Sequence, residues 1–152
     1  MISLSPTPRL SWDEYFLGIV SSVAERATCD RGRSGALLVY QRQIVATGYV
    51  GSPPGFPHCD DVGHSIVDGH CIRTVHAEQN AIASAARTGI STLGATLYCT
   101  MSPCRVCAML ALTAGIDRVV SAYRYQNDAG LDVLTQAGIA AVVRDLTTPY
   151  VP

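Results

Sequence analysis

The chain has 152 residues, of which 48% are hydrophobic and 15% are charged, and its formal net charge at pH 7 is −1. A chain of this size and apolar content can bury a core of its own, which argues against an intrinsically disordered protein. The balanced charge argues against a polynucleotide-binding surface, and no apolar stretch approaches the ~20 residues needed to span a bilayer.

The N-terminal part of the sequence predicts an arm followed by a helix. Residues 1–10 include two prolines and are expected to form a loose arm. This arm has no charged region followed by an apolar run, so we expect a cytoplasmic protein whose cysteines are thiols or metal ligands rather than disulfides. The run "SWDE", Ser11 to Glu14, is a capping box with apolar residues after it at helical spacing. The helix is expected to end near Cys29.

A hairpin and a long loop are expected next. The β-rich runs over residues 35–40 and 44–49 predict two paired strands. Residues 51–71 are rich in turn formers and show no periodicity, so we expect a long ordered loop. A loop of this length inside a compact domain is uncommon unless it is functional or tied down.

The second half of the sequence alternates between helical and strand patterns. A helix is expected from His76 to about Thr88, closed by Gly89. The elements expected after it are a strand over 95–100, a helix with Ser102 as N-cap and Pro103 in its first turn that ends at Gly115, a strand over 118–123, a helix over 128–138 and a strand over 139–143. This alternation predicts an α/β fold in a single domain over residues 1–152, with a central mixed sheet of about five strands and helices on both faces.

Two short motifs carry residues with metal-binding chemistry. Cys104 and Cys107 are separated by three positions at the start of a predicted helix, and so share one helical face. The helix N-terminus favours the thiolate form that zinc requires. His76, at the start of another helix, supplies a third ligand. Three protein ligands leave one tetrahedral corner for water, which is the catalytic arrangement of zinc.

Glu78 stands two positions after His76, so the two side chains do not point the same way from a helix. We therefore expect Glu78 to flank the zinc and to accept a proton from the water that the metal activates. The alternative is a structural Cys₂His site in which Glu78 only caps the helix. The full pattern, H-x-E followed by P-C-x-x-C, is the signature of zinc-dependent nucleobase deaminases.

The stretches "HAEQNAI" and "SPCRVC" resemble the cytidine deaminase superfamily. The longer run "GYVGSPPGFPHCDDVGH…GHCIRTVHAEQNAI" is similar to the deoxycytidylate (dCMP) deaminase branch, and the similarity extends from about Ser11 to about Val143. This resemblance implies a cytidine-deaminase-like three-layer sandwich. It also implies a catalytic zinc held by His76, Cys104 and Cys107, with Glu78 as the proton shuttle. The implied reaction converts dCMP to dUMP and ammonia and feeds dTMP synthesis.

Other readings of the same motifs fit less well. Adenosine deaminases acting on tRNA need a basic surface, nucleoside cytidine deaminases usually carry PCGxC, and the riboflavin-pathway deaminases have a longer spacing between their cysteines. A deaminase of a modified deoxycytidylate, or of another cytosine nucleotide or nucleoside, is an alternative within the superfamily. A zinc-stabilised nucleotide-binding module is the non-enzymatic alternative, and Glu78 argues against it because a pure binder gains nothing from a carboxylate beside an open zinc site.

A second group of potential ligands surrounds the predicted loop. Cys29, Cys59 and Cys71 with one histidine would complete a tetrahedral zinc site, and some dCMP deaminases that the chain resembles carry such a second, structural zinc. His64 is favoured over His70, because His70 is adjacent to Cys71 and that adjacency strains chelation. The alternative is a set of free thiols and surface histidines. Cys99 lies in a predicted strand and is expected to be a plain core residue.

The resemblance also indicates residues near the substrate, namely Val50, Ala77, Ser102, Pro103 and Tyr125. Val50 stands where the family usually has an asparagine that is thought to bind the sugar hydroxyl. Valine makes no side-chain hydrogen bond, so either the substrate is altered or the substitution is compensated nearby. The arginines available for the phosphate are Arg31, Arg33, Arg73, Arg105 and Arg124.

The expected partner is a small nucleotide, with no nucleic acid and no membrane. Larger dCMP deaminases are typically hexamers regulated by dCTP and dTTP, which implies a homo-oligomer and those two effectors here.

Overall fold

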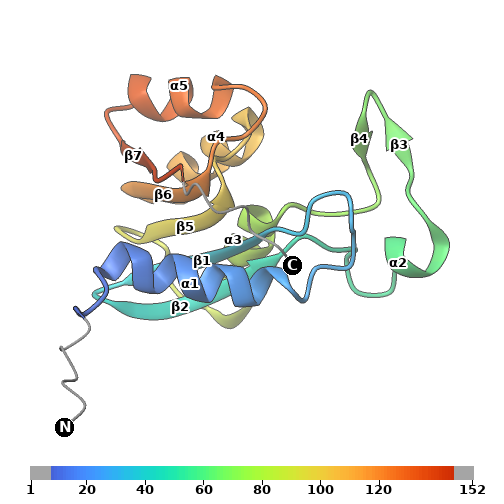
Figure 1. Cartoon of the computed structure of the whole chain (residues 1–152), viewed down its shortest axis with the longest axis horizontal. Helices are drawn as coiled ribbons and strands as arrows, with labels where there is room; N and C mark the ends of the chain where they lie inside the picture. Colours follow the sequence, from blue (N-terminus) through green and yellow to red (C-terminus); the bar gives the residue numbers. More distant parts are fainter. Residues whose placement is uncertain (1–7, 146–152) are drawn as a thin grey trace, which may run out of the picture.

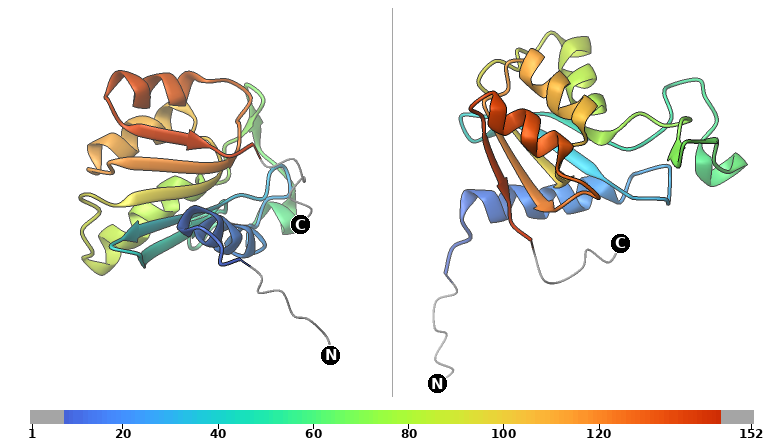
Figure 2. Two further views of the ribbon diagram at one scale, coloured as in Figure 1. Left: turned by 60° about the vertical axis from the view of Figure 1, so that its left-hand side comes forward. Right: turned by 90° about the horizontal axis from the view of Figure 1, so that it is seen from above.

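The computed structural model describes residues 8–145, and these form a central sheet with helices on both faces (Figure 1). The elements in chain order are α1 (Trp12–Ala24), β1 (Gly35–Tyr40), β2 (Gln43–Tyr49), α2 (Cys59–Val62), β3 (Ile66–Val67), β4 (His70–Cys71), α3 (Ala77–Thr88), β5 (Thr96–Met101), α4 (Arg105–Thr113), β6 (Arg118–Tyr123), α5 (Ala129–Gln136) and β7 (Ala140–Val143). In the right-hand view of Figure 2, α1 covers one face of the sheet, and α3, α4 and α5 cover the other. The predicted layered α/β fold is confirmed.

The five-stranded sheet has the order β2-β1-β5-β6-β7 and is mixed. Strand β1 is antiparallel to both β2 and β5, whereas β5, β6 and β7 run parallel. Gln41 and Arg42 join β1 to β2 with φ values of 48° and 64°, which is the conformation of a two-residue hairpin turn. Because β5 and β6 are parallel neighbours, the segments that follow them leave the sheet at the same edge. Ligand sites of α/β sheets gather at such edges.

Alternate residues of the central strands supply two separate core layers. In β1, Leu38 packs in the layer beneath α3, whereas Leu37 packs in the layer beneath α1 with Phe16 and Val20. This alternation follows from the two-residue period of a strand. Every one of these four side chains is at most 2% exposed, so α1 and α3 are fixed to the sheet by continuous apolar contact.

The first turns of α3 pack so closely on the sheet that the backbone of the helix contacts the backbone of β2. A Cβ built on Gly48 of β2 would stand 2.3 Å from both the Ala77 carbonyl oxygen and the Ala81 amide nitrogen. Only glycine permits this approach, and the alanines of α3 keep that side of the helix small. The close packing fixes where α3 begins, and therefore where the residues at its N-terminus lie.

Most of the predicted elements are confirmed. The capping box of Ser11 and Glu14 begins α1, and Gly89 ends α3 with a left-handed φ of 71°. Strands β1 and β6 have the predicted bounds, β2 and β7 differ by one residue at one end, and β5 differs by one residue at both ends. Residues 1–7 of the predicted arm lie outside the described residues. None of the helices within residues 8–145 combines the length and the apolar content that crossing a membrane would require.

The predicted end of the first helix near Cys29 is wrong, because α1 ends at Ala24. The backbone leaves the helix at this point to bond with the chain after β2: the Thr28 N–H donates to the Val50 carbonyl at 3.1 Å, and the Val50 N–H donates to the Ser34 carbonyl at 2.9 Å. These long-range bonds have no signature in the local sequence.

The expected long loop over residues 51–71 is also partly wrong, because it contains α2 and the two-stranded β3–β4 hairpin. Asp68 and Gly69 form the hairpin turn, with φ values of 48° and 78°. An Asp-Gly pair between β-prone residues is a strong hairpin signal, and the sequence interpretation missed it. In Figure 1 these elements form an arm, coloured green, that extends away from the sheet. We call residues 51–71 the cysteine arm.

One ion pair holds α1 to the sheet and predicts how the stability of the protein depends on pH. Arg118 donates to the two carboxylate oxygens of Asp13 at 2.9 and 2.8 Å, and the Tyr98 hydroxyl donates to the same carboxylate at 2.8 Å. The hydrogen bond from Arg118 holds the pKa of Asp13 below its ordinary value, against the opposing effect of burial. A carboxyl group with a depressed folded-state pKa stabilises the protein above its unfolded pKa, and this stabilisation is lost as the pH falls through the folded value.

We therefore expect Asp13→Asn to lower the free energy of unfolding by roughly 2 kcal/mol at pH 7. The difference from the unmutated protein should shrink as the pH is lowered below about 4, because the unfolded carboxyl takes up a proton there while the folded one is still ionised. Urea denaturation at pH 7 and pH 3 measures both values. Asp117→Asn, which alters an exposed carboxylate, serves as the control. An equal loss at both pH values would show that the effect does not come from the charge of Asp13.

Candidate functional site

His76, Cys104 and Cys107 come together at the N-termini of two helices. His76 is the N-cap residue of α3, and Cys104 is the N-cap residue of α4. The Nδ1 atom of His76 lies 3.7 Å from the Cys104 Sγ and 3.4 Å from the Cys107 Sγ. The residues that the sequence grouped as ligands of a catalytic metal are therefore neighbours in space.

The spacing of these atoms fits a zinc ion. With Zn–S bonds of about 2.3 Å and Zn–N bonds of about 2.1 Å, a tetrahedral site places sulfur and nitrogen ligands about 3.6 Å apart. Both measured sulfur–nitrogen distances lie close to this value, and the three potential ligand atoms all lie within 4.8 Å of one another. Two thiols and one imidazole are also the donor types that zinc prefers.

Ser102 does not cap α4 as expected, and this prediction is wrong. The helix begins at Arg105 with Cys104 as its N-cap. The Ser102 hydroxyl instead accepts a hydrogen bond from the Tyr125 N–H at 2.8 Å, and the Ser102 N–H donates to the Tyr123 carbonyl at 2.8 Å. Ser102 thus connects the end of β5 to the segment after β6, and the first helical turn is left to the cysteines.

Helix α5 packs against the turn formed by Pro103 and Cys104, which we call the cysteine turn. A Cβ built on Gly130 would stand 1.9 Å from the Pro103 carbonyl oxygen and 2.9 Å from the Cys104 carbonyl oxygen. The backbone of α5 therefore lies directly against the backbone that carries Cys104. Pro103 is fully buried at this contact, so it acts as part of the support.

The two thiols of this group differ in acidity. A hydrogen bond from Cys107, together with one from His76, lowers the pKa of Cys104 to about 3. The same hydrogen bond between the cysteines, together with burial, raises the pKa of Cys107 above its ordinary value. The bond to the Cys104 thiolate also raises the pKa of His76. These contacts therefore favour a thiolate at Cys104, and a bound divalent cation favours ionisation of the second thiol as well.

Glu78 lies in the first turn of α3 and is only 6% exposed. Burial raises the pKa of its carboxyl group above the ordinary value. A buried carboxyl with a raised pKa beside a metal site can both accept and return a proton near neutral pH. Glu78 thus has the environment of a general acid–base residue.

A cavity of about 440 Å³ opens onto this group, a volume typical of small-molecule sites. Of the residues expected near a substrate, Val50, Ala77, Ser102 and Tyr125 line it, whereas Pro103 is buried behind its wall. The cavity is also lined by residues that the sequence interpretation did not place there, among them Gly32, Ser34, Thr74, Met101 and Gln126. Met101 ends β5 and Gln126 follows β6 at one sheet edge, and that position was a usable signal.

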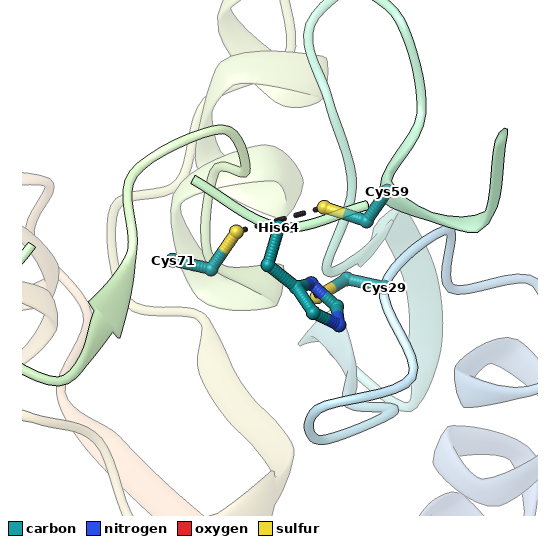
Figure 3. Close-up of side chains that lie close together, drawn as sticks. All are labelled: Cys29, Cys59, His64 and Cys71. Carbon is teal, nitrogen blue, oxygen red and sulfur yellow. Dashed lines mark hydrogen bonds between the residues drawn. The ribbon is translucent and has the colours of Figure 1, made fainter. Parts of the chain in front are cut away.

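Cys29, Cys59, His64 and Cys71 form a second group, which we call the Cys₃His cluster (Figure 3). The Cys59 and Cys71 sulfur atoms lie 3.6 Å apart, and the Cys29 sulfur lies 3.5 Å from the His64 Nδ1. A tetrahedral zinc site places two sulfur ligands about 3.8 Å apart, so the cluster also fits zinc. His70, the alternative ligand, is exposed on β4 instead. Cys99 is fully buried, as expected for a core residue.

The environment of the Cys₃His cluster favours ligation by His64 through its Nδ1 atom. The opposite ring nitrogen, Nε2, lies 3.0 Å from an Asp30 carboxylate oxygen. Histidine ligands usually donate their second N–H to such a carboxylate, which fixes the tautomer and the ring orientation. Burial and a hydrogen bond with Cys71 raise the pKa of Cys59 to about 12. For Cys71, burial is outweighed by hydrogen bonds from backbone groups of Ser65 and Arg73, and its pKa falls to about 6.

Comparison with known proteins gives one consistent family. The family model described as "Cytidine and deoxycytidylate deaminase zinc-binding region" matches residues 10–123. The chain is 40% identical over 124 residues to the deoxycytidylate deaminase of Mycobacterium phage D29, covering 74% of this chain and 94% of that protein. It is 39% identical over 132 residues to ComE operon protein 2 of Bacillus subtilis, covering 86% of this chain and 70% of that protein.

A similar solved structure is that of the dCMP deaminase from cyanophage S-TIM5 in complex with dCMP and dUMP. Its TM-score is 0.78 at 30% sequence identity, and the match covers 89% of this chain and 98% of that one. The fold expected from the sequence, a cytidine-deaminase-like sandwich, is therefore confirmed.

Proposed function

Because the chain belongs to the cytidine and deoxycytidylate deaminase family, we propose that it is a zinc-dependent hydrolase that converts dCMP to dUMP and ammonia and so feeds dTMP synthesis. The observation that carries this proposal is that Glu78, His76 and Cys104 line one cavity, with Glu78 buried and Cys107 beside His76 behind the cavity wall. Relatives named deoxycytidylate deaminase, and a similar structure that contains dCMP and dUMP, support the substrate. The proposed unit is a single domain, since α3 and α4, which hold the proposed zinc ligands and Glu78, cover the same face of one central sheet.

His76, Cys104 and Cys107 are the proposed ligands of the catalytic zinc. When bound there, zinc supplies a Lewis acid that makes water nucleophilic near neutral pH. As the water oxygen bonds to C4 of cytosine, Glu78 accepts one water proton and delivers it to N3. Glu78 then takes the remaining proton from the new C4 hydroxyl and passes it to the amine, which leaves as ammonia while the C4–N bond breaks and the C4 carbonyl forms. Val50, Ala77, Ser102 and Tyr125 are proposed to enclose the nucleotide. Tyr125 is half-buried in the cavity, and burial raises the pKa of its hydroxyl, so the phenol stays neutral and can donate a hydrogen bond.

Ammonia release from a panel of substrates tests this proposal. Purified protein is offered dCMP, CMP, deoxycytidine, dCTP and 5-substituted dCMPs, and dCMP is expected to give the highest kcat/KM. A preference for a 5-substituted dCMP would identify a deaminase of a modified nucleotide. If zinc is bound and no cytosine substrate releases ammonia, the enzymatic proposal fails and a nucleotide-binding module replaces it.

Val50 predicts a weak contact at the sugar end of the substrate. Its backbone is fixed by hydrogen bonds to Ser34 and Thr28, and its side chain lines the cavity. An apolar side chain leaves a sugar hydroxyl without a partner. We expect Val50→Asn to raise kcat/KM for dCMP by about threefold to tenfold, the effect of one added hydrogen bond. Steady-state kinetics measures this change, with the exposed Val62→Asn as the control. An unchanged kcat/KM and an unchanged order of substrates would show that Val50 is a tolerated substitution.

A second zinc, with a structural role, is proposed in the Cys₃His cluster. The four ligand atoms lie within 4.8 Å of one another, and the cluster joins the segment between α1 and β1 to the cysteine arm. Elemental analysis of the purified protein is expected to give about two zinc ions per chain, one for each ligand group. A value near one that persists in Cys59→Ser would assign all bound metal to the catalytic group.

A homo-oligomer and regulation by dCTP and dTTP are proposed from family resemblance. Light scattering in solution tests for the hexamer of the larger enzymes, and assays with each nucleotide added test for the effectors. The proposed location is the cytoplasm.

A further inference from the structure

The cavity wall distinguishes among the five arginines that the sequence makes available for a phosphate. Among residues 8–145, Arg31 and Arg124 line the cavity that contains Glu78, whereas Arg105 lines an adjoining one. Arg33 and Arg73 line neither of these cavities: Arg33 donates to the Ala27 carbonyl, and Arg73 donates to the Gly63 carbonyl at 3.2 Å. The choice of an anion-binding arginine therefore lies between Arg31 and Arg124.

These two arginines differ in the charge that they offer to a ligand. Arg124 is paired with Asp128 at 2.7 Å, so much of its charge is balanced within its own segment. Arg31 donates to the neutral carbonyl of Gly69 at 3.1 Å, and no carboxylate of the described residues forms an ion pair with it. The remaining N–H groups of Arg31 are available, and guanidinium groups bind phosphate oxygens in pairs.

The position of Arg31 depends on the Cys₃His cluster. Arg31 follows Cys29 by two residues, and its hydrogen-bond partner Gly69 precedes Cys71 by two residues. The side chain thus spans two segments that the cluster brings together. Cys29 and Cys71 themselves line the same cavity. Any change that separates these two cysteines also moves the Gly69 carbonyl to which Arg31 donates.

We propose that Arg31 binds the 5′-phosphate of the nucleotide and that the Cys₃His cluster holds Arg31 in position for this contact. This inference rests on the proposed deaminase function, and it gives the cluster a role in substrate selection. The cluster sets the preference for a mononucleotide over a nucleoside, because only the mononucleotide carries the phosphate that Arg31 contacts. The cytosine end of the substrate lies with Glu78 and is independent of the cluster.

The first test compares substrates with and without a phosphate. Arg31→Gln should raise KM for dCMP about 10- to 100-fold, the loss expected for one charge-assisted contact. It should leave kcat for dCMP and kcat/KM for deoxycytidine unchanged. Calorimetry should show the same selective loss of affinity for dUMP but not for deoxyuridine, a result that does not depend on turnover. Arg26→Gln, an exposed arginine near the end of α1, makes the same charge change and should alter neither ligand.

The second test changes the cluster without touching the cavity wall. Asp30 is absent from the described lining of the cavity but contacts the His64 ring, and loss of such a partner typically lowers metal affinity about 10- to 100-fold. Asp30→Asn should therefore raise KM for dCMP at low free zinc, and added zinc should restore it. Arg31→Gln should not respond to zinc. Cys59→Ser should lose the cluster metal, and its loss of phosphate selectivity should persist when zinc is added. Circular dichroism checks that this variant is folded.

Three results would overturn the inference. Equal losses for dCMP and deoxycytidine in Arg31→Gln would show that Arg31 does not contact the phosphate. A phosphate-selective loss confined to Arg124→Gln would assign the contact to Arg124. Unchanged selectivity in a folded Cys59→Ser protein that lacks the cluster metal would separate Arg31 from the cluster. Failure of the unmutated protein to turn over any cytosine substrate counts against the proposed function alone, since the dUMP and deoxyuridine affinities still test Arg31.

Discussion

Glu78→Gln is expected to abolish turnover while the protein keeps its catalytic zinc. The carboxylate lies beside the proposed ligands and outside the ligand group itself, in the cavity where a substrate would bind. Glutamine has nearly the same shape but cannot accept and return a proton. Loss of a general acid–base residue costs about 10²- to 10⁴-fold in kcat, and here one residue serves several proton transfers, so the upper end of that range is expected.

Three measurements on the same preparation distinguish the possible roles of Glu78. The zinc content shows whether the metal-ligand group is intact, and the affinity for dUMP shows whether the cavity is intact. The single-turnover rate measures the chemical step itself. Glu78→Ala should also keep its zinc. Because alanine cannot bind zinc, this result would exclude the possibility that the glutamine of Glu78→Gln replaces Glu78 as a zinc ligand. Glu25→Gln, at the exposed end of α1, provides the matched control. Loss of zinc from both Glu78 variants would make Glu78 a ligand, and a kcat close to that of the unmutated protein would remove it as the proton carrier.

The elements that the sequence predicted well are those specified by neighbouring residues. The capping box at Ser11 and Glu14 and the glycine that ends α3 act within one helical turn, and both are confirmed. The apolar run of β6 is buried throughout its middle and was placed with its exact bounds. Such signals depend on local backbone geometry, so the sequence alone carries them.

Two of the errors occur where distant segments compete for the same hydrogen-bonding groups. Ser102 has the right residue type for an N-cap, but its hydroxyl accepts a bond from the Tyr125 N–H across the sheet edge. Helix α1 stops early because Thr28 bonds to the segment after β2. In both cases a tertiary contact decides between two locally acceptable structures, and no local pattern reports which one is formed.

The same distinction applies to the candidate site. The motif around His76 and the two later cysteines was grouped from spacing, because each residue begins or nearly begins a helix. The Cys₃His cluster was grouped only from residue types, and its geometry depends on how the cysteine arm folds back onto the segment between α1 and β1. The choice between Arg31 and the other arginines was inaccessible to sequence, since it depends on which side chains are already paired.

Gly130→Ala is expected to disrupt the turn that carries Cys104 through its contact with α5. The added methyl group would stand 1.9 Å from the Pro103 carbonyl oxygen, well inside any permitted contact. Because this neighbour is backbone, it cannot move away without displacing Cys104. We expect a loss of about 3 kcal/mol or more in the free energy of unfolding, at the upper end of the cost of overpacking. Zinc affinity at the catalytic group should fall as well, since Cys104 is one of its proposed ligands.

Gly18→Ala makes the identical change in the middle of another helix and is the control. A Cβ at Gly18 meets no atom within 4 Å, so only helix propensity acts, and the substitution should stabilise the protein by about 0.5–1 kcal/mol. Urea denaturation and a competition assay with a zinc chelator measure both variants. Opposite signs in stability, with weakened zinc binding confined to Gly130→Ala, would show that backbone contact between α5 and the cysteine turn holds the ligand group in place. If Gly130→Ala keeps both its stability and its zinc affinity, then α5 yields to the added methyl group, and the position of Cys104 is set by β5 and α4 instead.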